Sequence, residues 1–82
     1  MQRLTILNQH GDEVLTFDRQ LVAAVNDVVT EADAEQAFAK MKDAGYLSYT
    51  QNADGSNAAV IQRFDQIGDA EETVMSPSLQ GG

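Results

Sequence analysis

The sequence contains no cysteine and no tryptophan, and it has a single histidine and a single proline among its 82 residues. Without cysteine, disulfide bonds, thiolate metal sites and a thiol nucleophile are all excluded. The longest apolar run, Leu21 to Val25, is far shorter than the roughly 20 residues that a membrane-spanning helix needs. The amino-terminal segment also lacks the long apolar core of a signal peptide. We therefore expect a soluble, cytoplasmic protein.

Basic residues are scarce as well. Five Lys and Arg stand against 13 Asp and Glu, which gives a formal net charge of −8. Proteins that bind nucleic acid or anionic membranes need clustered Lys and Arg, so this balance argues against both kinds of partner. It favours either a partner with a basic docking face or simply a well-solvated acidic surface, and we give these two interpretations equal weight.

No group of residues predicts a catalytic or metal centre. His10 lies in an expected loop with no partner spaced for catalysis or metal binding. The acidic clusters, such as Glu71-Glu72, show no pattern that would separate an acid from a base. The oxygen-rich stretch 52–57 lacks the length and the final glutamate of an EF-hand loop, so a plain turn is favoured over a calcium site. We expect a protein that is not an enzyme and that binds no metal or cofactor.

The first third of the chain predicts a hairpin and a less regular segment. Residues 4–7 and 14–17 are short β-prone segments, and the polar link between them contains Gly11. Residues 18–29 then carry apolar side chains at helical spacing, although their valines also suit an extended chain. We expect a short helical or irregular connection in that segment.

The clearest element is a helix over about residues 31–44. Thr30 and Asp33 have the spacing of a capping box at its start. Apolar residues between Ala34 and Met41 then recur at i, i+3, i+4 and i+7, which forms one apolar stripe. Gly45 suits the position directly after the helix, where a positive φ is common.

The second half predicts further strands. Residues 46–50 and 58–64 read as a second hairpin around the Asp54-Gly55 turn, with Val60 and Phe64 on one face of the second strand. Residues 73–75 form a last strand before Pro77, which ends regular hydrogen bonding. A helix packed across one face of a sheet of four or five strands buries both apolar surfaces, so we expect an α+β fold.

The chain ends with Ser76-Pro77-Ser78-Leu79-Gln80-Gly81-Gly82. Two residues without side chains let the backbone approach another surface closely. This ending, behind a hairpin, a helix and further strands, resembles the β-grasp superfamily of ubiquitin-like proteins. It is most similar to the Pro-Pro-hydrophobe-x-Gly-Gly ending of the prokaryotic sulfur carriers and the small subunit of molybdopterin synthase. Ser78 stands where those carriers have their second proline.

The resemblance implies a fold and a division of the chain. The fold is the β-grasp, a mixed sheet of four to five strands with one main helix packed across it. Residues 1–76 are the ubiquitin-like domain, and residues 77–82 are a flexible tail. Ubiquitin-like proteins generally bind partners through the sheet face opposite the helix. The candidates for such a patch are whichever of Leu47, Tyr49 and Ile61 point away from the helix.

The resemblance also implies a function. An E1-like adenylating enzyme uses ATP to activate the carboxylate of Gly82, which is then thiocarboxylated or conjugated to a lysine of a target protein. A JAB-type protease is a further partner of such systems. Gly81 permits close threading, Leu79 anchors the tail in an apolar groove, and Pro77 stiffens its exit from the domain.

Two other functions remain open at this stage. The first is an acidic, non-catalytic β-grasp module for binding or assembly, such as a structural subunit of a phage-like particle or a component of an enzyme complex. The second, weaker alternative is an acidic inhibitor that mimics the phosphates of nucleic acid. It requires the carboxylates to line up on one face.

Overall fold

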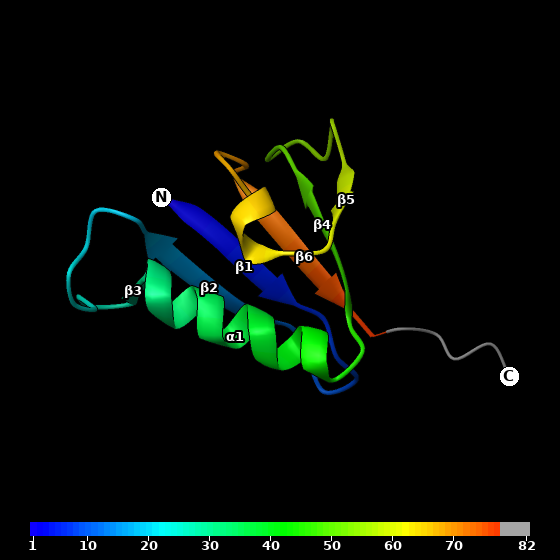
Figure 1. The fold of residues 1–82 in the computed structure, drawn as a ribbon, viewed down its shortest axis with the longest axis horizontal. Helices are drawn as coiled ribbons and strands as arrows, with labels where there is room; N and C mark the ends of the chain where they lie inside the picture. Colours follow the sequence, from blue (N-terminus) through cyan, green and yellow to red (C-terminus); the bar gives the residue numbers. More distant parts are fainter. Residues whose placement is uncertain (78–82) are drawn as a thin grey trace, which may run out of the picture.

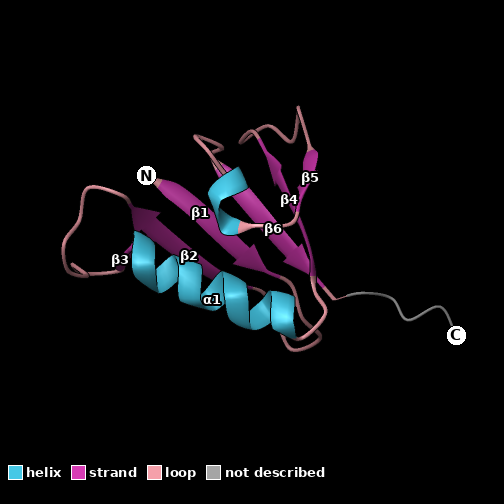
Figure 2. Ribbon diagram, viewed as in Figure 1, coloured by secondary structure: helices cyan, strands magenta, loops and turns pink. Residues whose placement is uncertain are grey.

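A computed structural model describes residues 1–77 of the chain. Within these residues, six strands form one sheet, and a single α-helix packs on one of its faces (Figures 1 and 2). The strands are β1 (Gln2–Ile6), β2 (Glu13–Asp18), β3 (Val28–Thr30), β4 (Leu47–Gln51), β5 (Ala59–Ile61) and β6 (Glu72–Ser76). The helix is α1 (Glu31–Asp43), and a short 3-10 helix, η1 (Phe64–Gln66), precedes β6. The α+β class is confirmed, whereas the expected count of four or five strands is wrong.

The sheet is mixed, in the order β3-β2-β1-β6-β4-β5. The first and last strands, β1 and β6, lie side by side and run parallel in its middle. β2 pairs antiparallel with β1 on one side, while β4 and β5 continue the sheet on the other side in antiparallel pairs. None of the helices within residues 1–77 has the length and apolarity needed to cross a membrane.

Helix α1 begins as its sequence predicts. The Thr30 hydroxyl accepts a hydrogen bond from the Asp33 backbone N–H at 3.2 Å, and the Asp33 carboxylate accepts one from the Thr30 N–H at 3.3 Å. The capping box is therefore confirmed. Gly45 follows the helix with φ +93°, and the Tyr46 N–H donates to the Met41 carbonyl, which closes the last turn.

The segment before α1 forms no helix. Residues 19–27 are an irregular loop, and residues 28–30 form β3, a strand parallel to β2. Val25 and Val28 exchange both backbone hydrogen bonds at 2.9 Å across a turn in which Asn26 has φ +54°. The outward backbone groups of β3 are thereby satisfied, because Val28 bonds to Val25 and the Thr30 N–H bonds to Asp33. Pairing with β2 and this closed edge outweigh the helical spacing of the apolar residues.

The second predicted hairpin is shorter than expected. Its second strand ends at Ile61, and Phe64 lies in η1 rather than on a strand. The Gln66 side-chain oxygen accepts hydrogen bonds from the Gln62 and Arg63 N–H groups, which turns the chain out of the sheet. Val60 is 76% exposed while Phe64 is buried, so the expectation that they share a face is wrong.

The core lies between the sheet and α1. Its buried side chains come from all parts of the chain, including Leu4, Phe17, Phe38, Ile61 and Met75. The Phe64 ring packs against Phe17 and Phe38 with ring centroids 5.8 and 5.7 Å apart. The core thus joins α1, η1 and both hairpins into one unit, and no helix within residues 1–77 covers the opposite face of the sheet (Figure 1).

Candidate functional site

The sheet face opposite α1 carries a row of side chains across five strands. In the register of the sheet, Thr5 lies between Val14 and Val74, and Tyr49 lies between Val74 and Val60. Leu47 lies two residues from Tyr49 on β4, so it points to the same face. We call the apolar part of this surface that lies on β4, β5 and β6 the outer-face patch: Leu47, Tyr49, Val60 and Val74. Leu47 and Val60 are 56% and 76% exposed, so the patch offers apolar area to a partner.

The three residues predicted for this patch do not all lie on it. Leu47 and Tyr49 face away from α1, but Ile61 is only 5% exposed and belongs to the core on the helix side. The placement of Ile61 in the patch is therefore wrong, and Val60 occupies that place. The β4–β5 register decides this, since Ile61 pairs with the inward-facing Ser48, whose hydroxyl donates to the Ile61 carbonyl at 2.8 Å. Residues 59–61 are apolar on both sides, so the sequence alone did not settle the facing.

The patch has one polar border. The Glu72 carboxylate accepts hydrogen bonds from the Gln51 amide and the Thr5 hydroxyl, and it lies 3.6 Å from the Arg3 guanidinium. The Glu72 side chain is only 18% exposed, so these three partners hold it against the sheet. The opposite end of the patch has no such cluster within residues 1–77, and there the chain leaves the sheet.

The exit of the chain lies at the patch. Ser76, the last residue of β6, pairs with Leu47, the first residue of β4. Pro77 follows directly and is exposed. Whatever follows Pro77 therefore starts next to an exposed apolar side chain on the outer face. The other predicted tail residues, Leu79, Gly81 and Gly82, lie outside the described residues.

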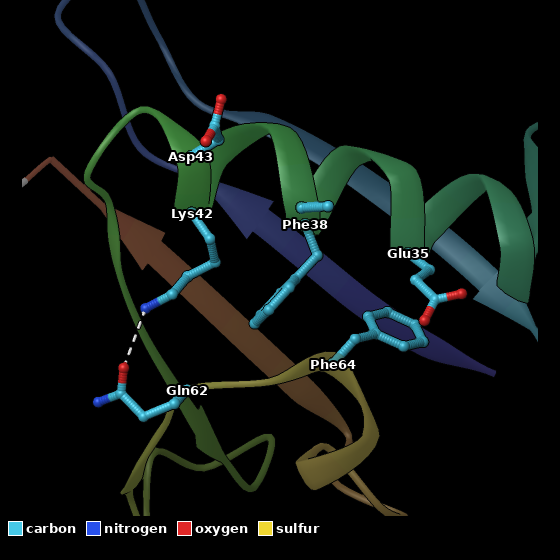
Figure 3. Close-up of a pocket in the computed structure, with 7 residues that line it drawn as sticks. Glu35, Phe38, Lys42, Asp43, Gln62 and Phe64 are labelled. Atoms are coloured by element: carbon cyan, nitrogen blue, oxygen red, sulfur yellow. Dashed lines mark hydrogen bonds between the residues drawn. The ribbon is translucent and has the colours of Figure 1, made fainter.

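A concave surface lies on the helix side of the sheet. We call it the helix-side groove, a cavity of about 440 Å³ between α1 and the segment from β5 to η1 (Figure 3). Phe38, Ala39 and Phe64 supply its apolar lining, while charged and polar side chains of Glu35, Lys42, Asp43 and Gln62 surround it. The Lys42 ammonium donates to the Gln62 side-chain oxygen at 3.5 Å across the groove.

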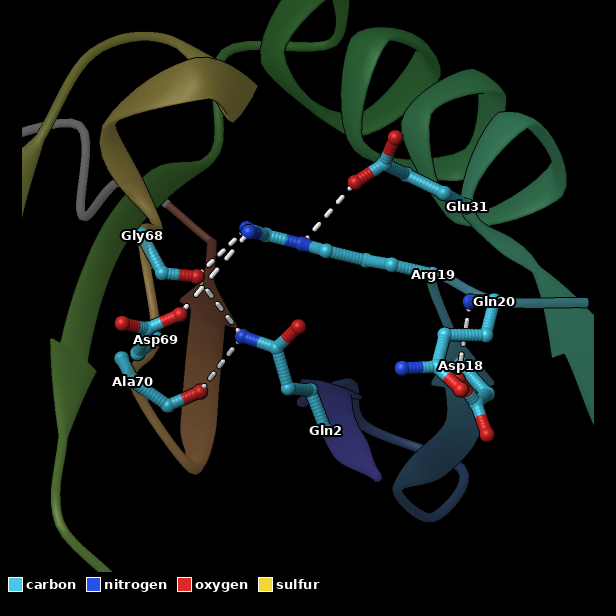
Figure 4. Close-up of polar contacts among 8 residues, drawn as sticks. All are labelled: Gln2, Asp18, Arg19, Gln20, Glu31, Gly68, Asp69 and Ala70. Atoms are coloured by element: carbon cyan, nitrogen blue, oxygen red, sulfur yellow. Dashed lines mark hydrogen bonds and ion pairs between the residues drawn. The ribbon is translucent and has the colours of Figure 1, made fainter.

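A polar network holds the connection between η1 and β6 (Figure 4). The Arg19 guanidinium pairs with Glu31 in the first turn of α1 at 2.9 Å and donates to the Gly68 carbonyl. The Gln2 amide donates to the carbonyls of Gly68 and Ala70, both at 2.9 Å. These contacts join the ends of β1 and β2 to residues 67–70, which explains how a polar, glycine-containing connection keeps its place.

The other candidate groups stay separate. Within residues 1–77, no three His, Cys, Asp or Glu residues come together in a way that could hold a metal ion. His10 is exposed in the β1–β2 loop, where its backbone N–H donates to the Asn8 side-chain oxygen. In the 52–57 turn, hydrogen bonds from the Ser56 hydroxyl and backbone N–H lower the pKa of Asp54, so its carboxylate serves the turn itself.

Comparison with models of known protein families, with curated proteins and with solved structures finds no significant match for this chain.

Proposed function

We propose that this chain is a ubiquitin-like carrier or modifier with the β-grasp fold, activated at the Gly82 carboxylate by a partner adenylating enzyme. The arrangement of the elements supports the fold. Two hairpins, β1–β2 and β4–β5, flank a last strand that runs parallel to the first, and one helix crosses the sheet. The segment that leads into β3, and β3 itself, are additions to that plan.

The observation that carries the functional proposal is where the terminal motif begins. The sequence Pro77-Ser78-Leu79-Gln80-Gly81-Gly82 follows β6 directly, at the end of the strand beside Leu47. An enzyme that takes the Gly-Gly end into a narrow active site needs a second, apolar surface nearby to hold the domain. The outer-face patch supplies such a surface at the tail's origin.

The proposed chemistry takes place in the partner enzyme. A Gly82 carboxylate oxygen attacks the α-phosphorus of ATP, pyrophosphate leaves, and an acyl-adenylate forms. Sulfide then attacks the carboxyl carbon and displaces AMP, which leaves a thiocarboxylate and releases a proton. Alternatively a partner's thiol attacks the same carbon and displaces AMP to give a thioester, from which a target lysine takes the acyl group and releases the thiol. Gly81 and Gly82 present no Cβ to the active-site walls, and Pro77 lowers the conformational entropy that the tail loses on docking.

The proposal is tested by mass spectrometry of the chain from its native cells. The last basic residue is Arg63, so trypsin leaves residues 64–82 on any lysine to which Gly82 is joined. We expect either this long branch on target peptides or, in the intact chain, the mass gain of sulfur replacing one carboxylate oxygen. Purified adenylating enzymes from the same cells are tested one at a time with ATP. The partner enzyme should be the one that releases pyrophosphate when this chain is added and does not when it is left out.

Two variants give the controls. Deleting Gly81 and Gly82 should abolish all three signals: the release of pyrophosphate, the branch of residues 64–82 on target peptides, and the replacement of oxygen by sulfur at the carboxyl group. Replacing Gly81 with valine keeps the terminal carboxylate but adds a branched side chain that a narrow channel excludes, so activation should fall as strongly. If neither variant alters any modification, or if Gly82 never carries a free or activated carboxyl group in the cell, the proposal is wrong.

The acidic binding or assembly module remains the second candidate. It is favoured by the exposed apolar area of the outer-face patch together with the net charge of −8, which suits a partner with an apolar centre and a basic rim. Unchanged partner binding and unchanged cellular function after deletion of Gly81 and Gly82 would favour this module over the carrier.

A further inference from the structure

The helix-side groove combines an apolar floor with a free acid. Its floor consists of Phe38 and Phe64, which are nearly buried, and of Ala39, which is exposed. Glu35 is exposed at one end of the groove, where its side chain lies beside the Phe64 ring (Figure 3). None of the ion pairs formed among residues 1–77 includes Glu35. The groove therefore offers a partner an apolar contact and a negative charge side by side.

The bases beside the groove are engaged by other groups. Lys42 lines the groove, but its ammonium points to the Gln62 side-chain oxygen and away from Glu35 (Figure 3). A second hollow of about 260 Å³ adjoins the groove, because Glu35 and Phe64 line both. Its base, Arg19, already pairs with an acid of the same hollow. Acids outnumber bases along the two hollows, with Glu31, Glu35, Asp43 and Asp65 against Arg19 and Lys42.

This charge decides which kind of partner fits the groove. A second copy of this chain, with its net charge of −8, would be repelled. Nucleic acid and anionic membranes would be repelled for the same reason. A protein segment that carries Lys or Arg close to an apolar side chain complements both features. Its apolar side chain contacts the floor of the groove, while its cation pairs with Glu35.

The spacing of residues on α1 sets the spacing in the partner. Glu35 and Ala39 are four residues apart, which is about 6 Å along the helix axis. In an extended segment, side chains on one face are two residues apart, or about 6.6 Å. A basic residue two positions from an apolar one therefore reaches Glu35 while the apolar side chain lies over Ala39. An α-helix of about 10 Å diameter fills roughly 900 Å³ over 12 Å of its length, which exceeds the groove's volume of about 440 Å³.

We propose that the helix-side groove binds an extended segment of a partner protein in which a basic residue lies two positions from an apolar one. The basic side chain pairs with Glu35, and the apolar side chain packs on Ala39 between the two phenylalanine rings. The outer-face patch lies on the other face of the sheet, so both surfaces can be occupied together. The contact does not involve Gly82, and it stands or falls independently of the carrier function.

An NMR titration of the full ¹⁵N-labelled chain with a short peptide tests the proposal. The probe is acetyl-Lys-Ser-Leu-Ser-Lys-amide, which presents the pattern in both chain directions. We expect saturable binding with a Kd of about 1 mM, and shift changes at the backbone amides of residues 35–43 and 62–64. Raising the salt concentration should weaken binding about threefold, because the ion pair is screened. The permuted peptide Ser-Lys-Leu-Lys-Ser has the same charge but the wrong spacing, so it should bind about threefold more weakly.

Two pairs of variants locate the contact. Glu35→Gln keeps the shape of the side chain but removes its charge, and it should weaken peptide binding about threefold or more. Glu71→Gln removes the same charge at an exposed position outside the groove and should leave binding nearly unchanged. Ala39→Leu fills the floor and should abolish binding, whereas Ala32→Leu, the same change at another exposed position on α1, should not. The NMR spectra of the free variants check that all four are folded.

Four results would overturn the proposal. The basic peptide could cause no shift changes, or it could shift the amides of the outer-face patch in place of those around the groove. The acidic peptide Glu-Ser-Leu-Ser-Glu could bind as tightly as the basic one, which would remove the charge from the contact. Glu35→Gln and Glu71→Gln could weaken binding equally, which would show attraction by the net charge alone. Equal binding of the permuted peptide would contradict the extended arrangement.

Discussion

Replacing Phe64 with alanine tests the placement of η1 over the core. Phe64 is only 9% exposed, and its ring contacts those of Phe17 and Phe38. Phe-to-Ala changes in cores cost about 3–5 kcal/mol. Because one side of the ring faces the open helix-side groove, water can fill part of the resulting cavity, and we expect Phe64→Ala to lower the free energy of unfolding by about 3 kcal/mol. The free energy of unfolding of a chain of this length is about 4–12 kcal/mol, so the loss is large but leaves a measurable folded state.

The matched control is Val60→Ala. If residues 58–64 were one strand with Val60 and Phe64 on the same buried face, both truncations would remove buried apolar contacts, and Val60→Ala would also lower the free energy of unfolding clearly. Since Val60 is 76% exposed, we expect this change to alter the free energy of unfolding by about 0.5 kcal/mol or less. Urea unfolding followed by circular dichroism measures both values, and Phe64→Leu provides a milder variant at the same site. Similar losses for Phe64→Ala and Val60→Ala, or a loss below about 1 kcal/mol for Phe64→Ala, would refute this placement of η1.

Two further changes test the remaining polar contacts. Arg19→Ala removes a partly exposed ion pair with Glu31 and a hydrogen bond to the Gly68 carbonyl. We therefore expect the free energy of unfolding to fall by about 1 kcal/mol and the amide hydrogen of Ala70 to exchange faster. Unchanged exchange at Ala70 would contradict the role of Arg19. Thr73 is fully buried, and its hydroxyl has no hydrogen-bond partner within residues 1–77. Thr73→Val should therefore raise the free energy of unfolding by about 1 kcal/mol in urea titrations, and a decrease would show that the hydroxyl is satisfied.

The elements that sequence reasoning predicts well are those fixed by local interactions. The capping box of Thr30 and Asp33 and the positive φ of Gly45 involve residues at most a few positions apart, so the sequence contains the whole signal. The first hairpin is of the same kind, because its two strands follow each other around a glycine-bearing loop. These elements account for α1, β1 and β2.

The elements that it misses depend on distant partners. Of the two structures expected for residues 18–29, the irregular connection is present over residues 19–27 and the helix is not, while the three-residue strand β3 was missed because it is held by β2 and by Val25. Phe64 lies outside the strand for two reasons. The Gln66 side-chain oxygen accepts a hydrogen bond from the Arg63 backbone N–H, which turns the chain, and the Phe64 ring packs against Phe17 in the core. Ile61 faces inward because of its pairing with Ser48, which no periodicity reveals in a stretch that is apolar on both sides.

The candidate site shows the same division. Pro77 and the glycines after it are recognisable as a motif in the sequence alone. The neighbourhood of that motif is not, since it requires knowing that β6 ends opposite Leu47. The exposure of residues 22–25 was equally hidden, because a run of apolar residues is more often buried than exposed.

The central claim, that Gly82 is the reactive end of a carrier, is tested most directly by tryptic mass spectrometry of proteins from cells that express the chain. The carrier function predicts residues 64–82 attached through Gly82 to a target lysine, or sulfur in place of oxygen at the Gly82 carboxyl group. Both must disappear when Gly81 and Gly82 are deleted. A Gly82 carboxylate that stays unmodified in cells and that no adenylating enzyme of those cells activates would contradict the claim.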